Sequence, residues 1–280
     1  MLIDLHTHST FSDGLLTVDQ LIKLAKKKRV KLLGLTDHDT VDGLETFRKK
    51  SGLVGIKTVR GMELSTDFNG VELHILGYGV NPRTKILKNY LEFQQKKRLE
   101  RAKKVIARLQ KIGFALKAEI IRHLLRQPAV GKPQLGRAIL KERQNRILLK
   151  RLFGFAGSLA DFIAKFLDQP GQIGYVHKKK ADSVSAIRLI QKSRGRAVLA
   201  HPDIDLSSPR LARKIIPRLA KNGLWGLEMP RTFPTRKKYL LPLAKKYNLV
   251  ITYGSDTHDG KRLGVKVKEK EGKKLMGFWK

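Results

Sequence analysis

The sequence predicts an α/β fold, in which buried parallel strands form a barrel that a helical insertion interrupts. Short apolar runs of strand length alternate with helical segments on both flanks of the chain, and several runs end in a polar side chain of functional type. The middle of the chain shows helical patterns and few strand signals. A length of 280 residues is sufficient for one barrel with an insertion.

The first barrel part, residues 1–82, shows a β-α-β-α-β-β order. Its first helix begins at Thr17, a residue type that caps helix N-termini, and ends in basic residues that suit the negative end of the helix dipole. A second helix is expected from Asp42 toward Lys50. Strands are expected at 2–6, 31–36, 56–59 and 71–76, with the last two adjacent in the sheet.

Residues 83–174 are expected to form a basic helical insertion. A long charged helix extends to about Gly113, with leucine, isoleucine and valine at helical spacing. Further helices are expected at 117–126, 134–143 and 159–167, and Lys and Arg are frequent along them.

The β/α alternation resumes in the second barrel part, residues 175–265. The expected elements are a strand signal at 174–176, a helix at 183–192, a strand at 196–200, a helix at 210–221, a strand at 224–228, a helix at 235–247 and a strand at 249–253. Residues 266–280 are lysine-rich and interrupted by glycine. They are expected to form a basic tail or a last strand.

Several of the expected strands end in metal-ligand side chains. His6 and His8 point the same way because side chains alternate along a strand, and the same period applies to Asp256 and His258. Imidazole and carboxylate groups also follow the other runs, at Asp37-His38-Asp39, at Glu63 with His74, and at His201. The sequence therefore predicts a metal site at the strand ends.

The charge of the chain is strongly basic, with 59 Lys and Arg against 24 Asp and Glu, which leaves +35. One interpretation is the general surface chemistry of a thermophile or of a lysine-rich genome. The functional interpretation is a polyanionic partner, since nucleic acid binds such a surface through counterion release. The run at 178–180 could then guide a nucleic-acid backbone.

Compartment signals are few. The chain has no cysteine, so no disulfide can form, and the N-terminal apolar run is short and contains Asp4 and His6. No apolar stretch approaches the ~18 residues of a membrane span. The sequence therefore predicts a cytoplasmic protein without a membrane partner, and it gives no indication of the oligomeric state.

Six motifs in order resemble the polymerase and histidinol phosphatase (PHP) family of phosphoesterases. The resemblance spans roughly residues 1–80 and 175–260. The motifs are His6-Thr7-His8-Ser9 with Ser12-Asp13-Gly14, Thr36-Asp37-His38-Asp39-Thr40, Gly61-Met62-Glu63-Leu64-Ser65, Leu73-His74-Ile75-Leu76-Gly77-Tyr78, Leu199-Ala200-His201-Pro202 and Gly254-Ser255-Asp256-Thr257-His258. The resemblance implies a distorted (β/α)7 TIM-like barrel whose C-terminal rim binds two or three divalent metal ions.

The resemblance also implies the metal ligands, through which catalysis would occur. They are His6, His8, Asp13, His38, Glu63, His74, His201, Asp256 and His258. The set is intact, which indicates an active enzyme. Imidazole and carboxylate ligands without thiolate favour manganese, with zinc or iron as alternatives, over an all-oxygen magnesium or calcium site.

Other acidic residues near the motifs have weaker assignments. Asp13 could instead cap a turn. Asp37 and Asp39 are expected to orient imidazoles or to cap strand ends, and Asp4 shares a face with His6 and could support it from below. Glu228 could approach the rim or pair with a neighbouring base.

Within the family, the chain is more similar to the branch that hydrolyses nucleoside 3′,5′-bisphosphates and trims 5′-phosphorylated oligonucleotides. Where that branch commonly shows Gly-Arg-Pro-His, this chain has Gly131-Lys132-Pro133-Gln134. A point-charge ammonium thus replaces a bidentate guanidinium, and an amide replaces an imidazole, so the rate or substrate preference could differ. Lys132, Arg137 and Arg231 are candidates for contact with the substrate phosphate.

The leading hypothesis is a metal-dependent phosphoesterase that uses a metal-activated water on nucleotide phosphates. It would act as a nucleoside 3′,5′-bisphosphate phosphatase, as a 5′-3′ exonuclease on short 5′-phosphorylated nucleic acid, or as both. One alternative is a small-molecule phosphatase of the histidinol-phosphate type, which gives no reason for the basic insertion. Another is a basic nucleic-acid-binding protein that uses the barrel as a scaffold. A metal amidohydrolase would normally require a bridging lysine, and no lysine occupies such a place.

Overall fold

The computed structural model describes residues 1–127, 129–177, 180–229 and 231–279. The chain divides into two compact units: unit 1 comprises Met1–Leu91 with Lys180–Lys280, and unit 2 comprises Glu92–Lys179. Of the lysine run at 178–180, residues 178 and 179 lie outside the described residues, whereas Lys180 pairs with Glu72.

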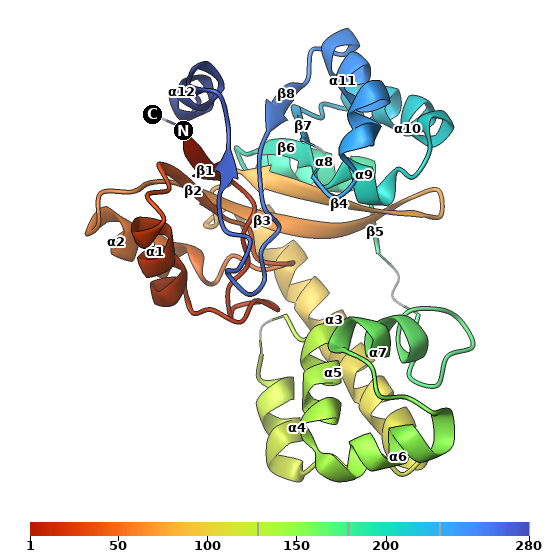
Figure 1. Ribbon diagram of the computed structural model, residues 1–280. Helices are drawn as coiled ribbons and strands as arrows, with labels where there is room; N and C mark the ends of the chain where they lie inside the picture. Colours follow the sequence, from red (N-terminus) through yellow and green to blue (C-terminus); the bar gives the residue numbers. More distant parts are fainter. Residues whose placement is uncertain (128, 178–179, 230, 280) are drawn as a thin grey trace. The chain divides into compact units, whose positions relative to one another are not determined.

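Unit 1 is built on one mixed sheet, whose strands follow the order β8-β7-β6-β4-β3-β2-β1-β9, with β5 paired to β3 (Figure 1). β1, β2 and β3 are parallel, as are β6, β7 and β8, and β4 is antiparallel to both of its neighbours. The strands are β1 (Leu2–Asp4), β2 (Leu32–Leu35), β3 (Lys57–Phe68), β4 (Val71–Tyr78), β5 (Ala181–Asp182), β6 (Arg196–Leu199), β7 (Gly226–Glu228), β8 (Val250–Thr252) and β9 (Val265–Lys266).

The sheet curls until the segments after β1 and β8 meet. The Leu5 N–H donates to the Tyr253 carbonyl at 2.9 Å, and the Asp256 N–H donates to the His6 carbonyl at 2.9 Å. The predicted α/β barrel class is thereby confirmed, and β3 and β4 are adjacent as expected. β3 is longer than expected, so Glu63 lies inside a strand and not beyond its end.

Helices pack against the sheet of unit 1 around a continuous apolar core. They are α1 (Val18–Lys27), α2 (Leu44–Gly52), α8 (Ser183–Lys192), α9 (Pro202–Asp205), α10 (Pro209–Lys221), α11 (Lys237–Lys246) and α12 (Glu269–Gly277), with the 3-10 turn η1 (Pro234–Arg236) before α11. The expected cap of α1 is present, since Thr17 Oγ1 accepts from the Gln20 N–H at 3.2 Å and Gln20 Oε1 accepts from the Thr17 N–H at 2.8 Å.

The C-terminal segment differs from the expected tail or last strand. Only two residues form β9, and residues 269–277 form the helix α12. Tertiary contacts account for the difference: the rings of Phe278 and Trp279 lie 5.0 and 5.9 Å from that of Trp225, and Leu275 is buried beside them. Burial of these aromatic rings stabilises a helix that the lysine-rich and glycine-containing sequence does not favour by itself.

Unit 2 has helices and no strand among its described residues: α4 (Ala118–Leu125), α5 (Lys132–Lys141), α6 (Arg143–Phe153) and α7 (Leu159–Phe166). α3 (Lys85–Lys111) begins in unit 1 and continues through unit 2. Residues 174–176, which gave a strand signal, form no strand, and α6 was not expected. Buried Phe and Leu side chains form a separate core, and the buried Asn145 side chain binds both backbone groups of Ala115, at 2.7 and 2.8 Å.

No helix in the described part of the chain combines the length and the apolar character that crossing a membrane would require.

Candidate metal centre

The nine predicted ligands all lie in unit 1. His6 and His8 follow β1, His38 follows β2, and Asp256 and His258 follow β8, so parallel strands deliver them to one rim. The others are Asp13 in the loop before α1, Glu63 in β3, His74 in β4 and His201 directly after β6.

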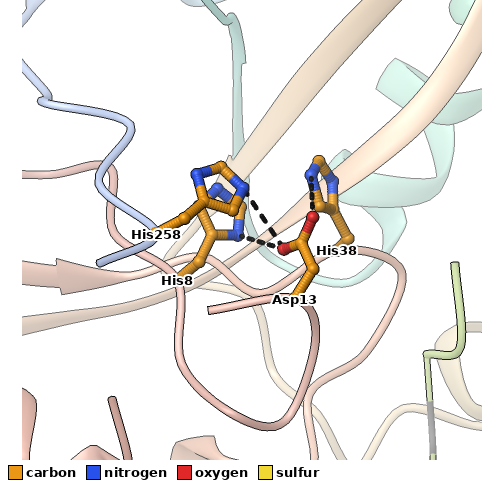
Figure 2. Close-up of side chains that lie close together, drawn as sticks. All are labelled: His8, Asp13, His38 and His258. Carbon is orange, nitrogen blue, oxygen red and sulfur yellow. Dashed lines mark ion pairs between the residues drawn. The ribbon is translucent and has the colours of Figure 1, made fainter. Parts of the chain in front are cut away.

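The donor atoms of these side chains form three clusters, and within each cluster they lie within 4.8 Å of one another. Figure 2 shows one of them, in which the Asp13 carboxylate faces the rings of His8, His38 and His258. Asp13 Oδ1 lies 3.2 Å from His258 Nε2. The other two clusters are His6, His8, Glu63 and Asp256, and Glu63, His74 and His201. The structure therefore brings all nine residues together.

Glu63 is the centre of this arrangement. It is fully buried, and its two carboxylate oxygens face imidazoles from four different segments. Its oxygens lie 3.2 Å from His6 Nε2, 3.2 Å from His8 Nε2, 3.1 Å from His38 Nδ1, 3.1 Å from His201 Nε2 and 3.6 Å from His74 Nδ1. Burial would raise the pKa of Glu63, but the surrounding imidazoles hold it well below its usual value. Glu63 therefore carries a charge inside the protein.

The arrangement of these nitrogen and oxygen atoms suits a bound divalent cation better than hydrogen bonds among the side chains. His38 Nδ1 and Glu63 Oε2 are buried and 3.1 Å apart, yet neither forms a hydrogen bond within the described part of the chain. Two imidazole nitrogens, His6 Nε2 and His8 Nε2, also face each other at 3.2 Å. A buried imidazole nitrogen and a buried carboxylate oxygen are costly without a hydrogen-bond partner, and a cation bound between them would satisfy both. A mixed imidazole and carboxylate set is typical of manganese, iron or zinc sites.

Neighbouring imidazoles in the centre have opposite pKa shifts. Burial disfavours the charged form of His8, but its hydrogen bond to Asp256 and the negative charges of Glu63 and Asp13 raise its pKa to about 10. Burial is the main cause that lowers the pKa of His38 to about 3. The nearby His8 and His74 lower it further, and together these effects outweigh the carboxylates of Glu63 and Asp13, which raise it. Asp13 and Asp256 have pKa values below their usual range, since burial is outweighed by the adjacent imidazoles. The carboxylates thus remain ionised.

Glu228 supports two of the candidate ligands at once. Its Oε1 lies 3.1 Å from His6 Nδ1, and its Oε2 accepts from the His201 N–H at 2.8 Å. The first contact directs His6 Nε2 toward Glu63, as carboxylates behind metal-binding imidazoles generally do. Gly254 allows this approach, because a Cβ there would lie 2.4 Å from Glu228 Oε1 and 2.2 Å from His6 Cβ. Of the two predicted roles, Glu228 takes the one at the rim.

The predicted supporting aspartates have different partners. Asp4 lies below the centre and accepts from the His6, Ser255 and Gly264 N–H groups at 3.3, 2.9 and 2.8 Å. Burial raises the pKa of Asp4 to about 6. Asp37 accepts from the Ser9 N–H at 2.8 Å and from its hydroxyl at 2.7 Å, which fixes the loop after His8.

Two further carboxylates had no assignment from the sequence. Asp205 Oδ2 lies 3.3 Å from His201 Nδ1, and the adjacent Asp203 binds backbone N–H groups of a neighbouring loop. Both follow His201 in α9. The short spacing to His201 was the signal that could have found them.

Three residues of the centre have a strained backbone conformation. Asp39, His201 and Asp256 have φ angles of 48°, 22° and 52°, in the left-handed region that non-glycine residues rarely adopt. Such conformations persist where the surrounding structure enforces them, and they cluster at functional sites. Asp39 also accepts from the Ser65 N–H at 3.2 Å, so it supports β3 two residues beyond Glu63.

The three candidates for substrate contact do not lie in one unit. Arg231 is in unit 1 and donates to the Arg262 carbonyl at 3.2 Å, while Lys132 and Arg137 lie on α5 in unit 2. Lys132 pairs with Asp168. Gln134, the second departure from the related motif, accepts from the Gly131 N–H at 3.0 Å and caps α5.

Comparisons with known proteins agree with this geometry. The PHP domain model matches residues 4–192. The chain is 30% identical over 263 residues to the 5′-3′ exoribonuclease Rnm of Escherichia coli, covering 92% of this chain and 85% of the relative. It is 33% identical to a phosphoribosyl 1,2-cyclic phosphate 1,2-diphosphodiesterase of Eggerthella lenta, over 92% and 94% of the two chains. It is 30% identical to a 3′,5′-nucleoside bisphosphate phosphatase of Chromobacterium violaceum, over 91% and 87%.

Solved structures share the fold. A Chromobacterium violaceum protein described as an amidohydrolase with bound sulfate superimposes with a TM-score of 0.80 at 27% identity, covering 95% of this chain and 92% of the other. A Bifidobacterium adolescentis structure gives a TM-score of 0.78 at 22% identity, covering 98% and 95%. With its rim of imidazoles and carboxylates, the chain belongs to the PHP domain family and is a metal-dependent phosphoesterase.

Proposed function

We propose that this phosphoesterase hydrolyses nucleotide phosphates, with the nine residues of the three clusters as ligands of two or three divalent metal ions. The observation that carries the proposal is the fully buried Glu63, shared by two clusters and 3.1 Å from His38 of the third. One carboxylate in contact with three sets of donors suits closely spaced metals. Manganese is the expected ion, with zinc or iron as alternatives.

The protein's own residues prepare the site for a phosphate ester. Bound metals would neutralise the phosphate and make a water nucleophilic at neutral pH. Glu228 contacts the ring of His6, and Asp4 accepts a hydrogen bond from the His6 N–H. Asp205 contacts the ring of His201. These buried contacts fix the ligand geometry before substrate arrives, which reduces the reorganisation needed during the reaction.

The relatives and the charge support a nucleotide as substrate. Two of the relatives are named for action on RNA or on nucleoside bisphosphates. Residues 92–179 contain 21 Lys and Arg against 6 Asp and Glu, which leaves +15. A surface of this charge attracts a polyanion through counterion release. The proposed substrates are therefore nucleoside 3′,5′-bisphosphates and short 5′-phosphorylated nucleic acid.

A second candidate substrate is phosphoribosyl 1,2-cyclic phosphate. The relative that is named for this substrate is 33% identical to the chain, and the match extends over 94% of the relative's length. It differs from the leading candidates in lacking a nucleobase, so the two proposals can be separated by assay.

The test is a side-by-side assay with Mn²⁺ of adenosine 3′,5′-bisphosphate, a 5′-phosphorylated RNA, phosphoribosyl 1,2-cyclic phosphate and histidinol phosphate. We expect the highest kcat/KM on the first two. A clear preference for either base-free ester would contradict the proposed substrate class. Absence of hydrolysis in the whole panel, from a protein with bound metal, would contradict it as well.

A further inference from the structure

The segment after β7 presents an aromatic ring and two guanidinium groups at the rim. Residues 231–236 are Arg231-Thr232-Phe233-Pro234-Thr235-Arg236, with no acidic side chain. Phe233 is 44% exposed, and the Arg236 guanidinium lies 4.2 Å from its ring centroid. A single exposed apolar side chain is common on protein surfaces, so its meaning depends on how it is held and what is next to it.

A buried carboxylate holds this segment firmly. Asp203 is 1% exposed, and its Oδ2 accepts from the Arg231 N–H at 3.0 Å and from the Phe233 N–H at 2.7 Å. The Arg236 guanidinium donates to the Asp203 carbonyl at 2.6 Å. Asp203 lies two residues after His201, in the short helix α9 that begins directly after His201. The position of Phe233 is therefore fixed relative to a candidate metal ligand.

The other side of the segment is tied to a second rim loop. Arg231 donates through Nη2 to the Arg262 carbonyl at 3.2 Å, in the loop that follows His258. That loop is itself held by Lys28, whose ammonium donates to the carbonyls of Lys261 and Leu263, both at 3.2 Å. Residues 231–236 thus bridge the two segments that carry His201 and His258, and all of them belong to unit 1.

We propose that Phe233 is the residue on which the base of the nucleotide substrate stacks, with Arg236 behind the ring and Arg231 beside it. This inference rests on the proposed function and specifies how the enzyme recognises the nucleoside. Every nucleobase has a π-face that stacks on an aromatic side chain, and cations next to it favour the anionic ligand. Phosphate alone and a base-free sugar phosphate offer no such face. Phe233 therefore separates nucleotides from other phosphate esters.

The experiment compares adenosine 3′,5′-bisphosphate with its base-free tetrahydrofuran 3′,5′-bisphosphate analogue, both with Mn²⁺. Phe233→Ala should raise the KM for the nucleotide roughly tenfold, which is the value of one stacked base, and leave the base-free analogue unchanged. Phe233→Trp should restore the wild-type preference. The matched control is Phe93→Ala, since Phe93 is 53% exposed and has Lys97 4.1 Å from its ring centroid, but lies on α3 in unit 2.

Binding provides a readout that does not depend on turnover. Calorimetry with Mn²⁺ should show that the wild type binds AMP more tightly than ribose 5-phosphate, and that Phe233→Ala loses this difference. The proposal is overturned if Phe233→Ala changes nothing, if it weakens both ligands equally, or if the wild type shows no preference for AMP. A wild type that binds AMP preferentially but hydrolyses no nucleotide would contradict the proposed function and support the stacking role.

Discussion

Unit 1 and unit 2 differ in how they use charged residues. In unit 1, carboxylates and imidazoles point inward and meet around the fully buried Glu63. In unit 2, 21 Lys and Arg accompany a small apolar core, and none of the three clusters found among the described residues includes a residue of this unit. A curled sheet can deliver side chains from several strands to one point, whereas short helices present theirs outward. We therefore expect unit 1 to carry out the hydrolysis and unit 2 to attract the polyanionic substrate.

Removal of metal should have the largest effect and should fall on unit 1. Chelation is expected to abolish turnover, and Mn²⁺ to restore it, because His38 Nδ1 and Glu63 Oε2 are buried without a hydrogen-bond partner among the described residues. Hydrogen exchange should increase at β3 and after β8 but stay unchanged in α4 to α7. Full turnover by protein shown by mass spectrometry to contain no metal would contradict the assignment of the centre.

Glu63→Gln should cost nearly as much as chelation. The substitution removes the negative charge that faces five imidazoles. Turnover should therefore fall by more than roughly a hundredfold, which is the upper end of the effect expected for residues that only support metal ligands. Metal content per chain should fall with it. The control is Glu119→Gln, the same change at an exposed position in unit 2, which should leave both quantities unchanged.

Glu228→Gln should have a smaller effect that is still specific to unit 1. An amide cannot replace the charge next to His6 Nδ1, although its oxygen can still accept from the His201 N–H. We expect the apparent affinity for Mn²⁺ to fall roughly 10- to 100-fold. Activity should recover in excess Mn²⁺, and Glu100→Gln on α3 serves as the matched variant. Loss of activity that excess metal does not relieve would argue against a positioning role.

Neutralising lysines of unit 2 should have the smallest effect, and only on long substrates. Lys103, Lys104 and Lys111 are exposed on α3, and their joint replacement by Gln should reduce the salt dependence of RNA binding. If each lysine contacts one phosphate, the slope of log K against log salt should become shallower by about 2. Hydrolysis of adenosine 3′,5′-bisphosphate should not change.

The matched triple change in unit 1 is Lys214, Lys221 and Lys245 to Gln, which removes the same charge from exposed positions on α10 and α11. Equal effects of the two triple variants on RNA binding would show that net charge matters and that unit 2 has no special part. That result would favour general surface chemistry as the explanation of the basic composition.

The alternation of short apolar runs with amphipathic segments predicted the α/β class, because strand and helix periods are local properties of a sequence. The same local rule predicted that His6 and His8 share a face. It failed at the C-terminus, where contacts with Trp225 stabilise α12, and at 174–176, where an apolar run forms no strand. Both failures concern segments whose structure depends on distant partners.

By itself, the sequence determined the alternation of strands and helices on both flanks of the chain, the residue types of the metal centre and the excess of positive charge. Only the tertiary structure decided that Glu63 faces five imidazoles, that Glu228 holds His6 and His201 together, and that Asp203 fixes Phe233 at the rim. The physical reason is the range of the interactions involved. Periodicity and capping act within a few residues, whereas these contacts join residues far apart in the chain that come together only when the sheet curls.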